Sequence, residues 1–293
     1  MGYLFLAISI LTAGFKGYYA KRTSQKIKDT ADALSVTFLR MVFCAAIGFV
    51  LLLVTEGPRA LAVPAETLWI PLLYGVSITV NLTSWILAIR SSAFLLLDGF
   101  GALGLLVPLL LSAALLREAI RPFQWLGLLI LFAAVLILCS YNRKIKGALT
   151  GSGLALLILN GASGGLAQFS QKLVSVEAPE VSTAAFQFYA FLFSALGVGL
   201  ICLFLPRKKG ARLFNGKLVG YVFILAACLF IHAYFLTAAA ARLPSVVVFP
   251  VVQGSFILLS TFNSAVFFKE RVTVRSAVGS VLVFLALVII NFL

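Results

Sequence analysis

Three charged residues lie inside apolar stretches long enough to cross a bilayer: Lys16, Arg40 and Asp98. A charged side chain at the bilayer centre costs at least about 2.5–3.5 kcal/mol, so such residues usually pair with one another or serve a function. At 1.5 Å of rise per residue, all three lie roughly 8–10 Å below the same surface. We therefore predict that Asp98 pairs with Arg40 or Lys16 in a gate or coupling site, which opens when a substrate or a proton competes for the carboxylate. The alternative is a permanent ion pair between Asp98 and Arg40, with Lys16 reaching toward the lipid head groups.

Neutral polar and aromatic residues farther from the ends of these stretches are candidate substrate contacts. Asn81, Trp85, His232 and Tyr234 lie farthest from both ends, although an isolated histidine is more often a hydrogen-bonded core residue than a ligand. The candidate set is completed by Gln187, Gln253 and Tyr19. A cage formed by Trp85, Tyr189 and Tyr234 would attract a quaternary ammonium group through cation-π interactions.

Motifs for catalysis or for cofactor binding are weak in this chain. Gly99 to Gly104 fits G-x-G-x-x-G, but it lies inside an apolar stretch with no strand before it, which argues against dinucleotide binding. Hydrolase and zinc-protease signatures are missing, and the chain has nine acidic residues. We expect no enzyme activity, no cofactor, no metal site and no catalytic residue.

The composition requires a membrane protein. Of the 293 residues 62% are hydrophobic and 11% charged, and the mean hydropathy is +1.12, whereas only about half of a soluble domain is apolar. Ten stretches have the length of about 20 residues that a spanning helix needs. They begin near residues 2, 33, 68, 92, 122, 151, 181, 218, 244 and 275. The first has neither a basic start nor a small-residue cleavage site, so it is expected to be a span and not a signal peptide.

The two halves of the chain repeat one another. Residues 68–138 align with residues 220–290 at a shift of 152, which places Glu118 on Glu270 and Gly127 on Gly279. Nearer the N-terminus the shift is 151, which pairs the residues Ser9 with Asn160, Thr12 with Ser163 and Lys21 with Lys172. Five spans in each half would turn the second copy upside down relative to the first. We predict an all-α integral membrane protein of ten transmembrane helices in two inverted five-helix repeats, residues 1–145 and 146–293.

Basic residues divide unevenly between the two predicted membrane faces. One face has 16 of the 23 lysines and arginines: Lys21, Arg22, Lys26, Lys28, Arg90, Arg143, Lys144, Lys146, Arg207, Lys208, Lys209, Arg212, Lys217, Lys269, Arg271 and Arg275. The other has Arg59, Arg117, Arg121, Lys172 and Arg242. The positive-inside rule makes the richer face cytoplasmic and puts both termini outside. Because these residues lie in short loops between spans, the net charge of +14 does not indicate nucleic-acid binding.

Spans five and ten, residues 123–140 and 276–291, carry almost nothing polar. Helices of this kind face lipid or a partner subunit. The protein is therefore expected to be a monomer, or a homodimer through these two spans.

The whole chain resembles the EamA-type family of the drug/metabolite transporter superfamily. The resemblance rests on the endings Leu116-Arg117-Glu118 and Phe268-Lys269-Glu270, each followed nine residues later by a glycine, and on the Phe38-Leu39-Arg40 stretch. It implies a secondary transporter in the cell (inner) membrane, with a cavity between spans one to four and six to nine. Family members usually have cytoplasmic termini, which is opposite to the orientation that the charges favour.

The expected function is alternating-access transport, with export favoured, of small metabolites such as amino acids or similar zwitterions. A proton is the candidate coupling ion, and the expected partners are the substrate and the lipid bilayer. Uptake of a quaternary ammonium such as choline is the first alternative. A lipid-handling membrane protein that does not transport is the second.

Overall fold

The computed structural model describes residues 1–24, 30–90, 101, 104–140, 151–204, 216–266 and 274–292, and the regular structure in these residues is helical. The α-helices are α1 (Gly2–Ser24), α2 (Thr30–Thr55), α3 (Trp69–Arg90), α5 (Leu106–Leu115), α6 (Pro122–Ser140), α7 (Gly151–Glu177), α8 (Thr183–Phe204), α9 (Gly216–Ala240), α10 (Ser245–Val266) and α11 (Val274–Phe292). Two 3-10 helices, η1 (Pro58–Leu61) and η2 (Ala65–Thr67), join α2 to α3. The all-helical prediction is confirmed, and nine of the predicted starts agree to within three residues. The fourth, near residue 92, lies outside the described residues.

Local sequence explains where several helices begin and end. After α2 the chain turns at Gly57, whose φ of 82° suits a residue without a Cβ, and Pro58 then opens η1. Pro122 is the first residue of α6, where its missing N–H costs no hydrogen bond. Ser182 caps α8, because its Oγ accepts a hydrogen bond from the Ala185 N–H at 3.1 Å.

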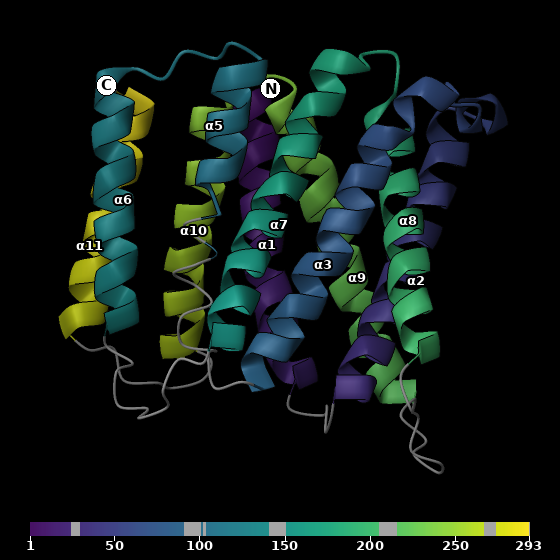
Figure 1. Ribbon diagram of the computed structural model, residues 1–293, viewed down its shortest axis with the longest axis horizontal. Coiled ribbons are helices and arrows are strands. Elements are labelled where there is room, and N and C mark those ends of the chain that lie inside the picture. Colours follow the sequence, from purple (N-terminus) through teal and green to yellow (C-terminus); the bar gives the residue numbers. More distant parts are fainter. Residues whose placement is uncertain are drawn as a thin grey trace.

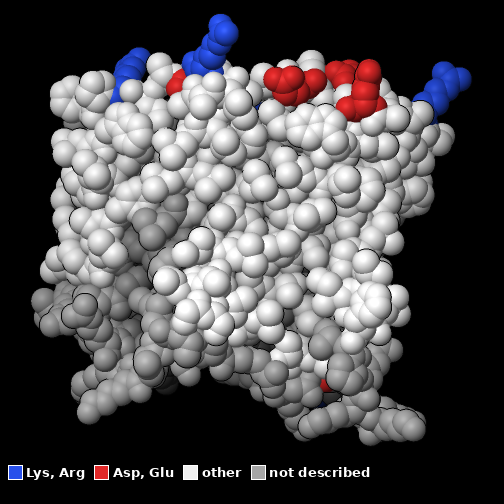
Figure 2. Space-filling view, in the orientation of Figure 1, with Lys and Arg blue, Asp and Glu red and all other residues white. Residues whose placement is uncertain are grey.

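The helices form a bundle in which they run roughly side by side (Figure 1). Among the described residues, α2, α8 and α9 are long and apolar enough to cross a bilayer. Both chain ends lie at one end of the bundle (Figure 1). Figure 2 shows most of the coloured charged side chains of this face at that same end, above an uncharged flank. We call the end of the bundle at which both chain termini lie the terminal end of the molecule.

Most helices pack closely against a helix of the other half of the chain. The pairs with the most extensive contacts are α3 with α7, α2 with α8, α1 with α9, and α6 with α11. One buried apolar cluster, which includes Met41, Phe186 and Phe191, joins α2, α3, α7, α8 and α9. A second, which includes Leu109, Leu131 and Phe249, joins α1, α5, α6, α9, α10 and α11. The two halves are therefore interleaved and do not form separate bodies.

The apolar helices predicted as spans five and ten correspond to α6 and α11, which pack on each other at one edge of the bundle (Figure 1). Their outer faces expose large apolar side chains such as Leu129 and Phe284. Gly127 permits the close approach, since a Cβ there would lie 2.6 Å from Ile290 Cγ1 and 3.1 Å from the Ala286 oxygen. The proposed homodimer through this edge remains a prediction.

Gly127→Leu is expected to separate α6 from α11 and to lower the free energy of unfolding by about 1–3 kcal/mol, the usual cost of overpacking. Unfolding of the purified protein in mixed micelles measures this difference. Leu129→Met, on the exposed face of the same helix, is the control and should leave stability unchanged. Equal stability of Gly127→Leu and the parent would show that the α6–α11 contact does not depend on this glycine.

Candidate functional site

A cavity of about 250 Å³ lies between helices of both halves. Its walls come from α1, α3, α7, α9 and α10, with Gly101 between α3 and α5. The polar or charged lining residues are Lys16, Tyr74, Asn81, Asn160, Gln168, Gln171, His232 and Gln253. At roughly 30 Å³ for each water molecule, the volume equals about eight waters, so it suits a compact solute.

Two pairs of polar residues tie the first half to the second at the cavity wall. On one side, Asn81 Nδ2 donates to the Asn160 oxygen and Asn160 Nδ2 donates to the Asn81 oxygen, each at 2.8 Å. On the other side, Ser9 Oγ donates to the His232 oxygen at 3.1 Å, and His232 Nδ1 lies 3.0 Å from the Ser9 oxygen. Each pair joins helices of different halves, and in each pair both side chains contact the backbone oxygen of the other residue.

The contacts of His232 anchor one nitrogen of its ring. His232 Nδ1 lies 2.8 Å from Ser9 Oγ and 3.0 Å from the Ser9 backbone oxygen. Nδ1 accepts from the hydroxyl in one tautomer and donates to the backbone oxygen in the other. In either tautomer α1 holds the His232 side chain in the cavity wall.

Glutamine side chains dominate the part of the cavity nearest the terminal end. Gln171 Nε2 donates to the Ala233 oxygen at 3.2 Å and to Thr237 Oγ1 at 3.1 Å. Gln187 Nε2 donates to the same two oxygens, at 3.2 and 2.7 Å, but Gln187 lies behind the cavity wall and is fully buried. Gln168 lines the cavity, and its buried Oε1 accepts no hydrogen bond. The Gln168 side chain therefore brings an unpaired acceptor to the cavity wall.

Lys16 is the one charged residue among those described as lining the cavity. Its Nζ lies 5.8 Å from the centre of the Phe256 ring, and it makes no ion pair or hydrogen bond in the described structure. Arg40 lies within electrostatic range of Lys16, and its Nε is buried without a hydrogen-bond partner. Asp98, predicted to neutralise one of these cations, lies outside the described residues.

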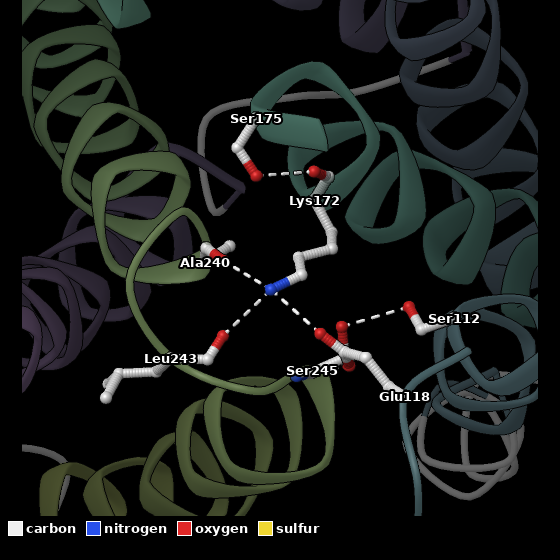
Figure 3. Close-up of polar contacts among 7 residues, drawn as sticks. All are labelled: Ser112, Glu118, Lys172, Ser175, Ala240, Leu243 and Ser245. Atoms are coloured by element: carbon white, nitrogen blue, oxygen red, sulfur yellow. Dashed lines mark hydrogen bonds and ion pairs between the residues drawn. The ribbon is translucent and has the colours of Figure 1, made fainter. Parts of the chain in front are cut away.

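Beyond the glutamines, a cluster that we call the terminal clamp joins α7 to the ends of α5 and α9 and the start of α10 (Figure 3). Lys172 Nζ lies 2.8 Å from Glu118 Oε1 and donates to the backbone oxygens of Ala240 and Leu243 at 2.9 and 3.1 Å. Glu118 Oε2 accepts from the Ser245 N–H at 2.8 Å, and Ser245 Oγ donates to Ser112 Oγ at 2.9 Å. The side chains of Lys172 and Glu118 are only 11% and 21% exposed. Such a shielded, hydrogen-bonded ion pair is stronger than one at a surface.

The end of α5 is shaped to deliver Glu118 to this clamp. Arg117 adopts a φ of 55°, a left-handed conformation that is uncommon for a residue with a side chain, and so terminates the helix. The Glu118 N–H then donates to the Ser112 oxygen at 3.2 Å. This turn fixes the Glu118 backbone beside the helix end that it leaves.

The clamp lies directly beyond the end of the cavity. Gln171, the residue before Lys172, lines the cavity, as does Gln168 one helical turn below. On α9, Leu236 lines the cavity one turn before Ala240, whose oxygen binds Lys172. An ion pair between the two halves therefore lies just beyond the cavity on the side of the terminal end.

The sequence-predicted residues are distributed unevenly around this site. Lys16, Asn81, His232 and Gln253 line the cavity. Those that lie elsewhere are Arg40, Gln187, Trp85, Tyr234 and Tyr19. Trp85 is 40% exposed, Tyr234 stacks on Phe230 at 6.2 Å, and Tyr19 lies 6.4 Å from the Tyr221 ring.

Sequence reasoning did not select Asn160, Gln168 or Gln171 as contacts, nor the Lys172–Glu118 pair as a closure. The repeat held a usable signal. It pairs Asn160 with Ser9, and it repeats both the lysine and the glutamate of the clamp.

Comparisons with known proteins agree with this architecture. The model of the EamA-like transporter family matches residues 1–140. This family belongs to the drug/metabolite transporter superfamily, and residues 1–140 of the chain are similar to it. A solved crystal structure is similar over 99% of the present chain and 96% of the other, with a TM-score of 0.78 and 18% sequence identity, which supports the fold alone. A search of curated proteins finds no significant match. The chain is accordingly an integral membrane protein whose N-terminal half is similar to a family of transporters.

Proposed function

We propose that the protein is a secondary transporter that carries a small polar metabolite through the central cavity by alternating access. The observation that carries this proposal is the cavity itself, which has polar groups from both halves inside an otherwise apolar bundle. Substrate sites of transporters with inverted repeats lie at the interface between the repeats, near the middle of the membrane. The lining of the cavity by helices of both halves is consistent with such a site.

Internal symmetry in the contacts supports two inverted repeats, residues 1–145 and 146–293. In the repeat, α1 corresponds to α7 and α3 corresponds to α9. When each helix is replaced by its counterpart, the contact of α1 with α9 becomes the contact of α7 with α3, and both contacts are extensive. The polar pairs do the same, because a shift of 151 relates Ser9 to Asn160 and Asn81 to His232. This shift at residue 81 is one less than in the sequence alignment of residues 68–138. Symmetry of this kind allows the two halves to rock between two related states.

The terminal clamp supports a state that is closed on one side. Since the ion pair joins opposite halves, a rocking motion that opens this side must break it. The charge distribution favours an extracytoplasmic terminal end, so the structure would represent a state closed to the outside. Members of the EamA-type family usually have the reverse orientation, with cytoplasmic termini. We propose export as the direction of transport.

Amino acids and similar zwitterions are the proposed substrates, because the cavity combines a cation with amide and imidazole groups in a small volume. Choline uptake is less well supported. Trp85, Tyr189 and Tyr234 form no cage around the cavity, and the Tyr189 hydroxyl donates to the Leu61 oxygen at 2.6 Å. The lipid-handling alternative is also less well supported, since the polar groups line an internal cavity. We propose the cell (inner) membrane as the location and a proton as the coupling ion.

Counterflow in proteoliposomes tests the proposal. The reconstituted protein should exchange at least one labelled amino acid, and Ala167→Phe, which fills the cavity, should reduce exchange at least about tenfold because the binding site is lost. Ala155→Phe, on the exposed face of the same helix, is the matched control and should transport normally. Equal exchange by both variants would place the pathway outside this cavity.

A further inference from the structure

We infer that Lys16 binds an anionic group of the transported substrate, and that the substrate also carries a hydrogen-bond donor for the amide-rich end of the cavity. This inference deepens the proposed function, since it names the chemical class that the same cavity takes. It concerns an organic anion with a hydroxyl, amide or ammonium group, of which an amino acid is one example.

The evidence for an anion begins with the charge of Lys16, which has no anionic partner among the residues that the structure describes. The residues described as lining the cavity include this cation and no carboxylate. The Lys16 ammonium has the Phe256 ring as its recorded partner, at a distance near the upper limit of a cation-π contact. An ammonium group in a low-dielectric cavity is stabilised far better by an anion that also accepts hydrogen bonds. The cavity therefore presents a charge that a ligand can match.

A second cation strengthens the preference for an anion. Arg40 acts electrostatically on Lys16 from α2, and two like charges close together in an apolar bundle repel one another. The buried Arg40 Nε also has no hydrogen-bond partner. A bound anion would offset this repulsion, whereas a bound cation would add to it.

An acceptor farther along the cavity specifies the other end of the ligand. Gln168 lines the cavity, and its buried Oε1 accepts no hydrogen bond. Because an unpaired buried acceptor is costly, a ligand with a donor group gains by reaching it. An anion with no donor would leave it unpaired.

Thermal stabilisation of the purified protein tests the inference, because a ligand that binds the folded state raises its apparent stability. The probes are amino acids and hydroxy acids, each compared with its carboxamide, and small phosphate monoesters, each compared with its parent alcohol. At about 10 mM, above the usual range of transport and Michaelis constants, at least one anion should stabilise the protein while its neutral counterpart does not. The two probe families distinguish a carboxylate from a phosphate as the bound group.

Variants then locate the anion. Lys16→Met keeps the length of the side chain and should weaken binding of the selected anion by at least about tenfold, whereas Lys16→Arg should retain most of it. Lys16→Met should fold as well as the parent, since the ammonium has no ion pair with the described residues to lose. Lys217→Met removes an exposed lysine at the start of α9 and should bind like the parent.

The outcomes distinguish a failure of the anion site at Lys16 from a failure of the proposed transport function. Equal stabilisation by an acid and its amide, unchanged binding by Lys16→Met, or no stabilisation by any anion would overturn the anion site. If counterflow in proteoliposomes occurs with neutral or cationic compounds alone, transport stands and the anion site fails. If an anion binds through Lys16 but is never exchanged, the site stands and the transport function fails.

Discussion

Lys172→Met is expected to open the cavity toward the terminal end of the molecule. The substitution removes the cation of the terminal clamp and leaves the largely buried Glu118 carboxylate with the Ser245 N–H as its recorded donor. Breaking a buried ion pair by removing one partner typically costs about 3–5 kcal/mol, because the remaining charge stays desolvated. In the open state water reaches the Glu118 carboxylate, so the loss of the Lys172 cation raises the free energy of the closed state relative to the open one. A penalty of this size would move the equilibrium between the two states about 100-fold or more.

The accessibility of a cysteine placed in the cavity measures this shift. The four native cysteines are replaced first, and Ala167→Cys then introduces a thiol into the cavity wall. A membrane-impermeant maleimide added from the side of the termini should label this thiol slowly in the parent and at least about tenfold faster with Lys172→Met. Unchanged labelling would show that the ion pair does not hold this end closed.

Two further variants separate the roles of charge and geometry in the clamp. Glu118→Gln should open the cavity to a smaller extent, since glutamine can still accept from the Ser245 N–H but leaves Lys172 without its anion. Exchange of the two charges, Lys172→Glu with Glu118→Lys, should not restore closure. Lysine at 172 donates to the backbone oxygens of Ala240 and Leu243, and a glutamate there would repel them. Arg121→Met removes an exposed cation at the same end and should label like the parent.

The helices were predictable because each one needs a continuous apolar run of fixed length, and breakers such as Gly57 and Pro122 mark its ends. The depth of a polar residue was also readable from its position in such a run. Lys16, Asn81 and His232 were selected by depth, and all three line the cavity. Depth is a one-dimensional property, and the linear sequence supplies it directly.

The facing direction of a residue was less predictable. Gln187 and Tyr234 have suitable depths, but they face the packed interior between α8, α9 and their neighbours. In a helix that is apolar on every side, the sequence does not say which side meets the cavity, because the packing partners decide it. The repeat carries part of the missing information. Asn160 could have been selected once Ser9 was recognised as polar at the equivalent position.

The clamp was hidden for a different reason. Lys172 and Glu118 both resemble the charged residues that commonly flank transmembrane spans, and they come from different halves of the chain. Only the packing of α7 beside the end of α5 brings the two charges together. A charge near a helix end therefore needs its three-dimensional neighbours before it can be assigned to solvent or to a gate.

That packing of α7 beside α5 depends on direct contact between backbones. A Cβ added to Gly165 would clash with the Gly104 oxygen, and one added to Gly104 would clash with the Gly161 oxygen. Gly161 and Gly165 form a G-x-x-x-G pair, the spacing that lets two membrane helices approach closely. The same contact forms the cavity wall at Gly161 and supports the helix that carries Lys172. Displacing it would disturb the cavity and the clamp together.

Gly165→Ala is therefore expected to destabilise the protein by at least about 3 kcal/mol, since backbone atoms cannot move aside as a flexible side chain can. Unfolding in mixed micelles and the folded yield after purification measure the loss. Gly220→Ala is the matched control. Its Cβ would meet nothing within 4 Å, so the same substitution in a helix should be neutral or stabilising by up to about 1 kcal/mol. If the two variants were equally stable, α5 and α7 would not be in backbone contact, and the closure of the cavity would have to depend on other helices.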